Sequence, residues 1–199
     1  MSSTAAIGFR AHSGWAAAVA ITGPLEAPVA IARRRIEMQE RGATGPSQPY
    51  HAAVGLALDE AAQLVEHYAA RAAALAVESL RSLIEDLRRL GHGVSGCGLP
   101  LASGRRLPPL AGILASHPLL HSAEGELFRE ALRAASRGCG LPLVEVKERD
   151  LFTRAAADLH LPVSETERHI AAMGKAIGPP WRQDQKFAAA AAWLALRGR

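Results

Sequence analysis

Cysteine, aromatic residues and long apolar runs are all scarce in this chain. Its 199 residues include only two cysteines, Cys97 and Cys139, without a CxxC spacing, so the sequence predicts neither a disulfide framework nor a structural zinc site. No apolar run approaches the roughly 20 residues that cross a bilayer, and the first residues lack the basic and apolar regions of a signal peptide. These absences together predict a cytoplasmic protein without a membrane partner.

Alanine and arginine are the residue types that stand out. Hydrophobic residues make up 49% of the chain but aromatic residues only 5%, so we expect helices that pack closely through small side chains. The net charge of +4 favours polyanionic partners such as DNA or RNA. A GC-rich genome would raise arginine and alanine together, so composition leaves both explanations open. The length suits one compact domain, and we expect residues 1–199 to form it.

The order of predicted elements is the main evidence for the fold. Apolar segments between turn residues predict three strands in close succession, at residues 5–9, 14–21 and 29–37. A stripe of leucines predicts one long helix, with Asp59 as its N-cap and Gly91 at its end. After it we expect a glycine-rich strand (92–101), a helix ending at Gly138, an interior strand (141–146), a helix (164–177) capped by Ser164 and Glu167, and an alanine-rich helix (186–196). The glycines of the 92–101 strand would let another backbone or a ligand approach closely.

Several stretches of the chain resemble the RuvC-like Holliday-junction resolvases of the ribonuclease H-like superfamily. Residues 7–10 (IGFR) and 13–16 (SGWA) are similar to that family's first strand and turn, IGIDPG…TGWAV. Residues 120–151 resemble its small-residue helix, the strand after it and the stretch beyond, and residues 183–196 resemble its last helix. The resemblance implies an α/β fold of ribonuclease H-like type. Such a fold has a mixed five-stranded sheet flanked by helices. The order along the chain would be three strands, a helix, a strand, a helix, a strand and a final helix.

The chain departs from the family at the residues that would cleave a phosphodiester. Family nucleases hold two divalent metal ions with a set of carboxylates. Here Phe9 and Arg10 stand where the first carboxylate is expected, and residues 94–101 contain no acid. On the last helix Asp184 is in place, but the next acid is replaced near Phe187. Most catalytic carboxylates are thus missing, and we expect no divalent metal cofactor.

The predicted fold brings a different set of polar residues toward the old catalytic cleft. We predict that Arg10, His51, Glu124, Asp184 and Lys186 form a repurposed site, with Glu124, His51, Asp184 and Lys186 as catalytic candidates. Binding candidates next to them are Arg10, His12, Tyr50 and His121. The alternative is that all of them have surface or capping roles.

The segment that begins the 118–138 helix holds the densest group of potentially reactive side chains. His117, His121 and Glu124 have a spacing that could bind a transition metal if they project from one side of a helix, although the histidines could equally be loop and capping groups. Glu124 and Glu126 are expected in the first helical turn, where the helix dipole favours carboxylates. Glu124 lies toward the apolar face, so it needs a buried partner, for which Arg10 and His51 are the candidates.

Arginines provide a second kind of candidate site. Arg33 and Arg35 share one face of a predicted strand, Arg34 takes the other, and Arg33 and Arg35 with Arg105 and Arg106 could contact phosphates. The alternative is a solvated edge strand that its charge protects from aggregation.

Three functions follow from these patterns. The leading hypothesis is a catalytically degenerate, non-nucleolytic module that binds nucleic acid or a partner protein through a basic face. The alternative is an enzyme of different chemistry, with His, Glu and Arg in the same cleft, so whether the chain is an enzyme stays open. The third is a homodimer joined through alanine-rich helices.

Overall fold

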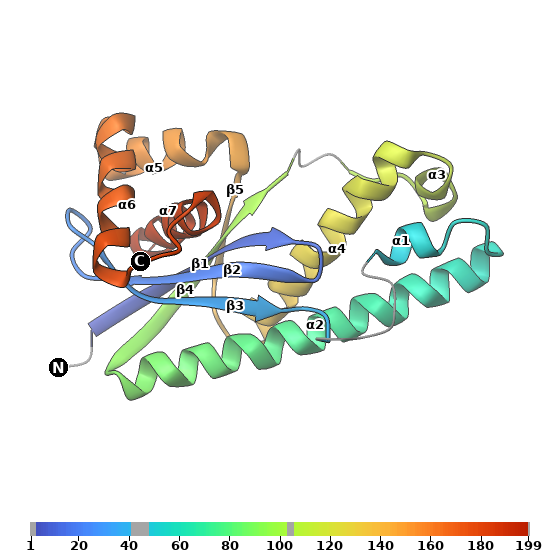
Figure 1. Cartoon of the computed structure of the whole chain (residues 1–199), viewed down its shortest axis with the longest axis horizontal. Coiled ribbons are helices and arrows are strands. Elements are labelled where there is room, and N and C mark those ends of the chain that lie inside the picture. Colours follow the sequence, from blue (N-terminus) through green and yellow to red (C-terminus); the bar gives the residue numbers. More distant parts are fainter. Residues whose placement is uncertain (1–2, 41–47, 103–105, 199) are drawn as a thin grey trace.

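The computed structural model describes residues 3–40, 48–102 and 106–198, and a five-stranded mixed sheet forms its centre (Figure 1). The strand order is β3-β2-β1-β4-β5. The first three strands pair as an antiparallel meander, whereas β4 runs parallel to β1, and β5 parallel to β4. The strands are β1 (Ser3–His12), β2 (Trp15–Thr22), β3 (Val29–Glu37), β4 (His92–Leu101) and β5 (Leu143–Lys147). This is the predicted ribonuclease H-like sheet.

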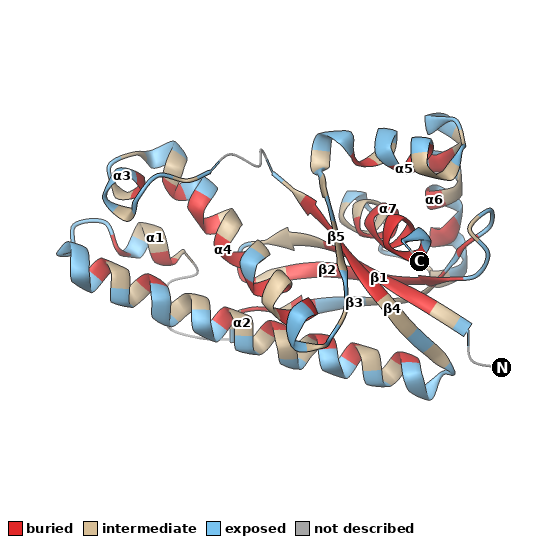
Figure 2. Cartoon of the chain, turned by 180° about the vertical axis from the view of Figure 1, so that it is seen from behind, coloured by how far each residue is buried: buried red, intermediate tan, exposed pale blue. Residues whose placement is uncertain are grey.

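Helices cover both faces of the sheet. They are α1 (Pro49–Ala52), α2 (Leu58–Arg89), α3 (Leu110–Leu114), α4 (His117–Gly138), the short 3₁₀ helix η1 (Glu148–Asp150), α5 (Leu151–Leu159), α6 (Val163–Ile177) and α7 (Gln183–Arg197). On one face α2 and α4 pack against Ile7, Phe9 and Leu99, and on the other α5, α6 and α7 pack against Ala6, Val19 and Ile21. Figure 2 shows buried residues concentrated in the central strands and in α7. In the part of the chain that the structure describes, no helix is long and apolar enough to cross a membrane.

Alanines let α7 lie directly on the sheet. All residues from Ala188 to Leu196 are buried, and the helix backbone lies against Gly8 of β1 and Gly98 of β4. A Cβ atom built on Gly98 would stand 2.1 Å from the carbonyl oxygen of Ala191. The expectation that glycines in residues 92–101 admit another backbone is therefore confirmed.

The long helix α2 is confirmed, but its buried stripe is only partly the predicted one. Leu80, Leu83 and Leu87 are buried as expected. Leu90 is 67% exposed because the helix ends at Arg89. In the first half of α2, small residues replace the expected leucines at the contact with α4: the buried positions are Ala61, Val65, Ala72 and Ala76.

Three local expectations were wrong. Asp59 and Ser164 do not cap helices, because α2 begins at Leu58 and α6 at Val163, and neither N-cap residue makes a side-chain hydrogen bond. The strand β5 lies at the sheet edge and is only half-buried, although its branched residues suggested an interior strand. The division of the chain into one domain stays a prediction.

Candidate functional site

Arg10 is the centre of a charged cluster at the carboxyl end of β1. Strand alternation points Phe9 into the core under α2 and α4, and Arg10 toward α7. The Arg10 guanidinium donates through Nη1 to Asp184 Oδ1 at 2.8 Å and through Nη2 to Glu148 Oε1 at 3.0 Å. It also lies over the Phe187 ring, 4.6 Å from the ring centroid. One cation therefore joins β1 to η1 and to the first turn of α7.

His12 extends this cluster toward β2 and β3. Its Nε2 lies 3.0 Å from Asp184 Oδ1, and its ring stacks on Trp15 with centroids 4.3 Å apart. On β3, the Arg35 guanidinium pairs with Glu37 and lies 4.1 Å from the centroid of the Trp15 ring of β2. His12 and Arg35, both binding candidates from the sequence, thus have Trp15 as a common neighbour.

A cavity of about 680 Å³ lies beside the Arg10 cluster. It is lined by Ala102, Arg129, Glu148, Arg149, Phe152 and Phe187. The cavity therefore combines two guanidinium groups and two aromatic rings with a carboxylate that Arg10 already holds. We call it the strand-end cleft, because β1 and β4 end beside it.

Arg129 is the residue of the strand-end cleft that the sequence did not suggest. Its side chain is 14% exposed, and its Nη1 lies 3.8 Å from Glu126 Oε2. Its Nε is buried and has no hydrogen-bond partner among the described residues. Burial is the main cause of a lowered pKa of Arg129, which Glu126 and Glu148 partly oppose. One turn further along α4, Arg133 pairs with three carboxylates, those of Glu126, Glu130 and Glu145. The Arg133 guanidinium is therefore engaged by carboxylates, whereas the Arg129 guanidinium can still donate hydrogen bonds.

Glu124 anchors a second cluster, where α1 packs against α4. Its side chain is 3% exposed, and its Oε1 accepts hydrogen bonds from the backbone N–H of Tyr50 (2.8 Å) and of His51 (3.2 Å). The His51 ring atom Nδ1 lies 3.3 Å from the same oxygen. Of the two partners predicted for buried Glu124, Arg10 and His51, the structure provides His51. The first-turn explanation for Glu124 and Glu126 is wrong, because α4 already begins at His117.

Burial dominates the electrostatics of this second cluster. Desolvation raises the pKa of Glu124, and the hydrogen bonds from His51 and Tyr50 oppose this only in part. Desolvation also raises the pKa of the Tyr50 hydroxyl, and the nearby Glu124 adds to the shift. Glu124 Oε2 is buried without a hydrogen-bond partner.

Three histidine rings meet beside Glu124. His117 and His121 lie one turn apart on α4, with their Nε2 atoms 3.1 Å from each other. The His51 ring lies 4.7 Å from the His121 ring and 5.6 Å from the His117 ring, measured between centroids. The sequence grouped Glu124 with the two α4 histidines. In the structure His51 is the residue that contacts them, and Glu124 contacts the His51 ring through Nδ1.

Four of the five residues predicted to share one cleft belong to two clusters with different partners. Arg10 and Asp184 are joined on the α7 side of the sheet. His51 and Glu124 lie where α1 meets the first half of α4, which extends past the sheet on the side of α2 (Figure 1). Lys186 is half-buried in the first turns of α7. The structure therefore pairs Arg10 and Glu124 with different residues and does not join them in one site, and whether the chain is an enzyme stays open.

The arginines of β3 have structural partners. Arg33 donates to the backbone carbonyls of Gly178, Pro179 and Pro180, which fastens the α6–α7 connection to the sheet. Arg34 points to the other face, as predicted, and pairs with Asp86 of α2. Arg106 is exposed just before α3, and Arg105 lies outside the described residues. Because the donors of Arg33 are engaged, the predicted phosphate patch of Arg33, Arg35, Arg105 and Arg106 is not supported.

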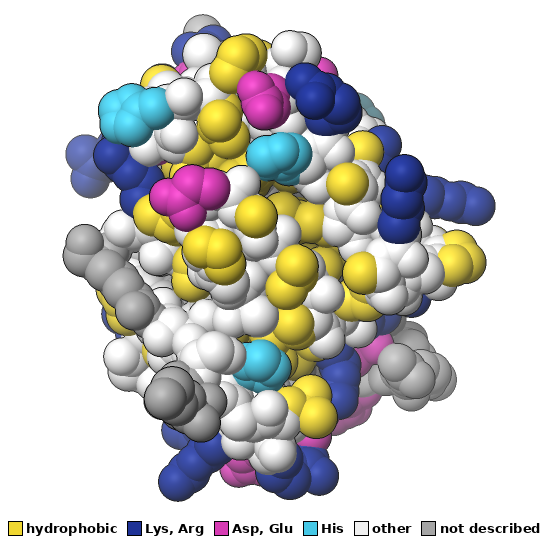
Figure 3. Space-filling view, turned by 90° about the vertical axis from the view of Figure 1, so that its left-hand side faces the viewer, with side chains coloured by type: hydrophobic (Ala, Val, Ile, Leu, Met, Phe, Trp, Pro, Cys, Tyr) yellow, Lys and Arg dark blue, Asp and Glu magenta, His cyan; other side chains and the backbone are white. Residues whose placement is uncertain are grey.

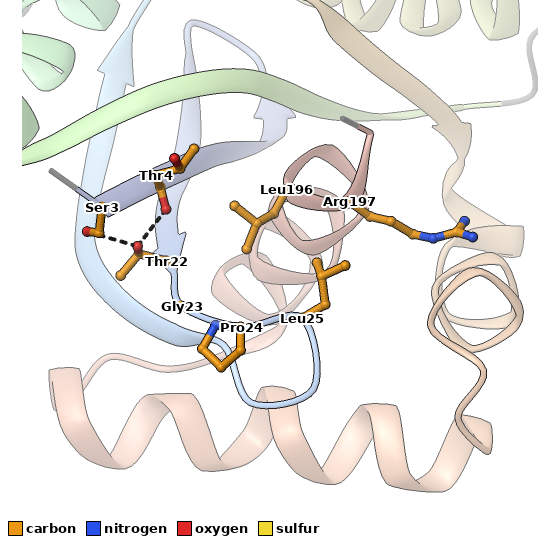
Figure 4. A pocket seen from close by; sticks show the side chains of 8 residues that line it. All are labelled: Ser3, Thr4, Thr22, Gly23, Pro24, Leu25, Leu196 and Arg197. Carbon is orange, nitrogen blue, oxygen red and sulfur yellow. Dashed lines mark hydrogen bonds between the residues drawn. The ribbon is translucent and has the colours of Figure 1, made fainter. Parts of the chain in front are cut away.

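Two other hollows lie at the end of the molecule that Figure 3 shows, where hydrophobic side chains gather between charged ones. One, of about 500 Å³, is lined by Ser3, Thr4, Thr22, Gly23, Pro24, Leu25, Leu196 and Arg197 (Figure 4). The Thr22 hydroxyl in it donates to the Thr4 carbonyl, and the guanidinium of Arg197 turns away toward Asp158. The other, of about 250 Å³, lies between residues 27–30 and α6. Neither identifies a ligand, and the homodimer stays a prediction.

The comparisons with known proteins identify the fold only. No protein-family model and no curated protein sequence matches the chain. Among solved structures, Thermus thermophilus RuvC superposes with a TM-score of 0.51 at 13% identity, over 96% of this chain and 92% of that one. The T. thermophilus RuvC complex with a Holliday-junction substrate gives a TM-score of 0.49 at 12% identity, over 96% and 90%. The chain therefore has a ribonuclease H-like α/β fold, and T. thermophilus RuvC is one protein with the same fold.

Proposed function

We propose that this protein is a non-nucleolytic module that binds single-stranded nucleic acid in the strand-end cleft. The proposal rests on Arg129, a largely buried guanidinium on the cleft wall whose Nη1 lies 3.8 Å from the Glu126 carboxylate. Because a phosphate oxygen accepts charge-assisted hydrogen bonds from arginine, a nucleic-acid backbone in the cleft would pair with the exposed part of this guanidinium. Arg149, whose side chain is 77% exposed, supplies a second cation at the rim.

Aromatic rings favour a single strand over a duplex. Phe152 and Phe187 line the same cleft, with their centroids 5.1 Å apart in an edge-to-face arrangement. Unpaired bases expose faces that stack on aromatic and guanidinium groups, whereas paired bases do not. DNA and RNA share this chemistry, and a comparison of the two oligonucleotides distinguishes them.

The donor set around Arg10 supports a protein that does not cleave what it binds. Two divalent ions need several carboxylates within reach, but β1 offers a guanidinium and β4 has no acid. Glu148 and Asp184 both bond to Arg10, so a metal ion between them would face a positive charge. These residues do not fit the two-metal site of the fold family.

Fluorescence anisotropy with labelled single-stranded DNA and RNA tests the proposal. We expect binding that weakens with salt, with a slope of log K against log salt of about −0.7 for each phosphate contacted. Arg129→Gln and Arg149→Gln should each weaken binding by roughly 3- to 10-fold and make the slope shallower by about 0.7.

Arg154→Gln is the matched control for this experiment. It removes the same charge from α5, where Arg154 pairs with Asp158 outside the cleft, so we expect it to bind as the wild type does. Circular dichroism shows whether each variant is folded. Binding that Arg129→Gln leaves unchanged, or that Arg154→Gln weakens equally, would overturn the proposed cleft.

A further inference from the structure

The three histidines beside α1 form a site that the proposed function does not use. Among the residues that the structure describes, His51, His117 and His121 are the group whose ligand atoms lie close enough together, within 4.8 Å of one another, to hold one ion. We propose that they bind one divalent transition-metal ion of the zinc type, with Glu124 holding His51 in position.

The orientation of His51 supports this assignment. Its Nδ1 lies 3.3 Å from Glu124 Oε1, so Nε2 is the atom left for a ligand. That Nε2 is buried and has no hydrogen-bond partner in the part of the chain that the structure describes. A carboxylate bonded to the second ring nitrogen fixes the tautomer and the direction of a metal-binding histidine. Glu124 is placed to act in this way.

The spacing of the imidazole nitrogens fits a tetrahedral ion. Zinc–nitrogen bonds of about 2.0–2.1 Å set the ligand nitrogens of a tetrahedron about 3.3 Å apart. The Nε2 atoms of His117 and His121 are already 3.1 Å apart, and the three ligand atoms lie within 4.8 Å of one another. A shift of the His51 ring by up to about 1.5 Å would bring all three nitrogens to the tetrahedral spacing. Two histidines one helical turn apart present their rings on one face without rearrangement of α4.

A purely structural role for these residues explains less. Glu124 could serve only as acceptor for the N–H groups of Tyr50 and His51, which would account for its Oε1. That role gives no reason for His117 and His121 to converge on His51. Imidazoles favour zinc, copper or nickel over magnesium or calcium. With His117 and His121 exposed, a fourth position is open to water, as in zinc sites with three protein ligands.

The test uses the full, untagged chain, freed of metal with EDTA and titrated with CoCl₂ and ZnCl₂. We expect a cobalt spectrum of tetrahedral type that saturates at one ion per chain and is displaced by zinc. Zinc should also raise the melting temperature, because binding only to the folded state stabilises it. MgCl₂ should cause neither change.

Variants distinguish this site from nonspecific metal binding. His117→Ala and His121→Ala change exposed side chains, so the chain should stay folded and lose the cobalt spectrum. Glu124→Gln should keep the site but weaken zinc binding about 10- to 100-fold. His67→Ala, at an exposed histidine of α2, is the matched control and should bind as the wild type does. An absent cobalt spectrum in the wild type, or one that His117→Ala leaves intact, would overturn the proposal.

Discussion

Replacing Gly8 by alanine is expected to lower the free energy of unfolding by about 3 kcal/mol or more, the upper range for overpacked cores. A Cβ atom at position 8 would stand 1.8 Å from the carbonyl oxygen of Ala188 and 2.4 Å from the backbone nitrogen of Ala192. Both are backbone atoms of α7, so no side chain can turn away to make room. The whole helix would have to move off the sheet.

Urea unfolding followed by circular dichroism measures this loss. Gly96→Ala is the matched control on the neighbouring strand, because its Cβ would approach its nearest neighbour, the Pro142 carbonyl oxygen, to only 3.3 Å. We expect that control to cost less than about 1 kcal/mol. Equal stability of the Gly8→Ala and Gly96→Ala proteins would contradict the close contact of α7 with β1.

Replacing Arg10 by aspartate is the second change with a large expected effect. It removes the cation shared by Glu148 and Asp184 and adds a third carboxylate. Breaking a fully buried pair costs roughly 3–5 kcal/mol. Here the three side chains are 17%, 36% and 27% exposed, so solvent screening reduces the expected loss to about 2 kcal/mol.

Magnesium separates this electrostatic effect from a packing defect. Three neighbouring carboxylates attract a hard divalent cation, so Mg²⁺ should raise the melting temperature of Arg10→Asp and leave that of the wild type unchanged. Arg154→Asp, at an exposed pair on α5, is the control that should lose little stability and gain nothing from Mg²⁺. An Arg10→Asp protein as stable as the wild type would show that Arg10 does not neutralise the cluster.

The sequence predicted the main elements and their order along the chain because periodicity is a local property, whereas the mixed five-stranded sheet came from the family resemblance. The apolar runs that mark the strands at residues 5–9 and 29–37, and the helical stripe that includes Leu80, Leu83 and Leu87, depend only on the neighbours of each residue. The glycines of β4 and the alanines of α7 also indicated a close helix–sheet contact. Cap positions and the edge position of β5 failed because they depend on which neighbour each element finds.

The candidate sites were harder to predict because they depend on tertiary position. Nothing in the sequence brings His51 to His117, since α1 and α4 meet only in the fold. Arg129 reads as an ordinary residue of the polar helix face, yet it lines the strand-end cleft because α4 reaches past Glu148. Arg10 was grouped with both Asp184 and Glu124, and strand alternation directs it to Asp184 and not to Glu124.

Binding of single-stranded nucleic acid without cleavage is the activity that we propose for this chain. It is tested most directly by incubating labelled DNA and RNA with protein above the dissociation constant, in EDTA and in Mg²⁺ or Mn²⁺, and resolving the strands on a denaturing gel. We expect full-length strands under every condition, at protein concentrations where anisotropy shows that the strands are bound. Cleavage that requires the metal and disappears in Asp184→Asn would contradict the proposal, as would the absence of any salt-dependent binding.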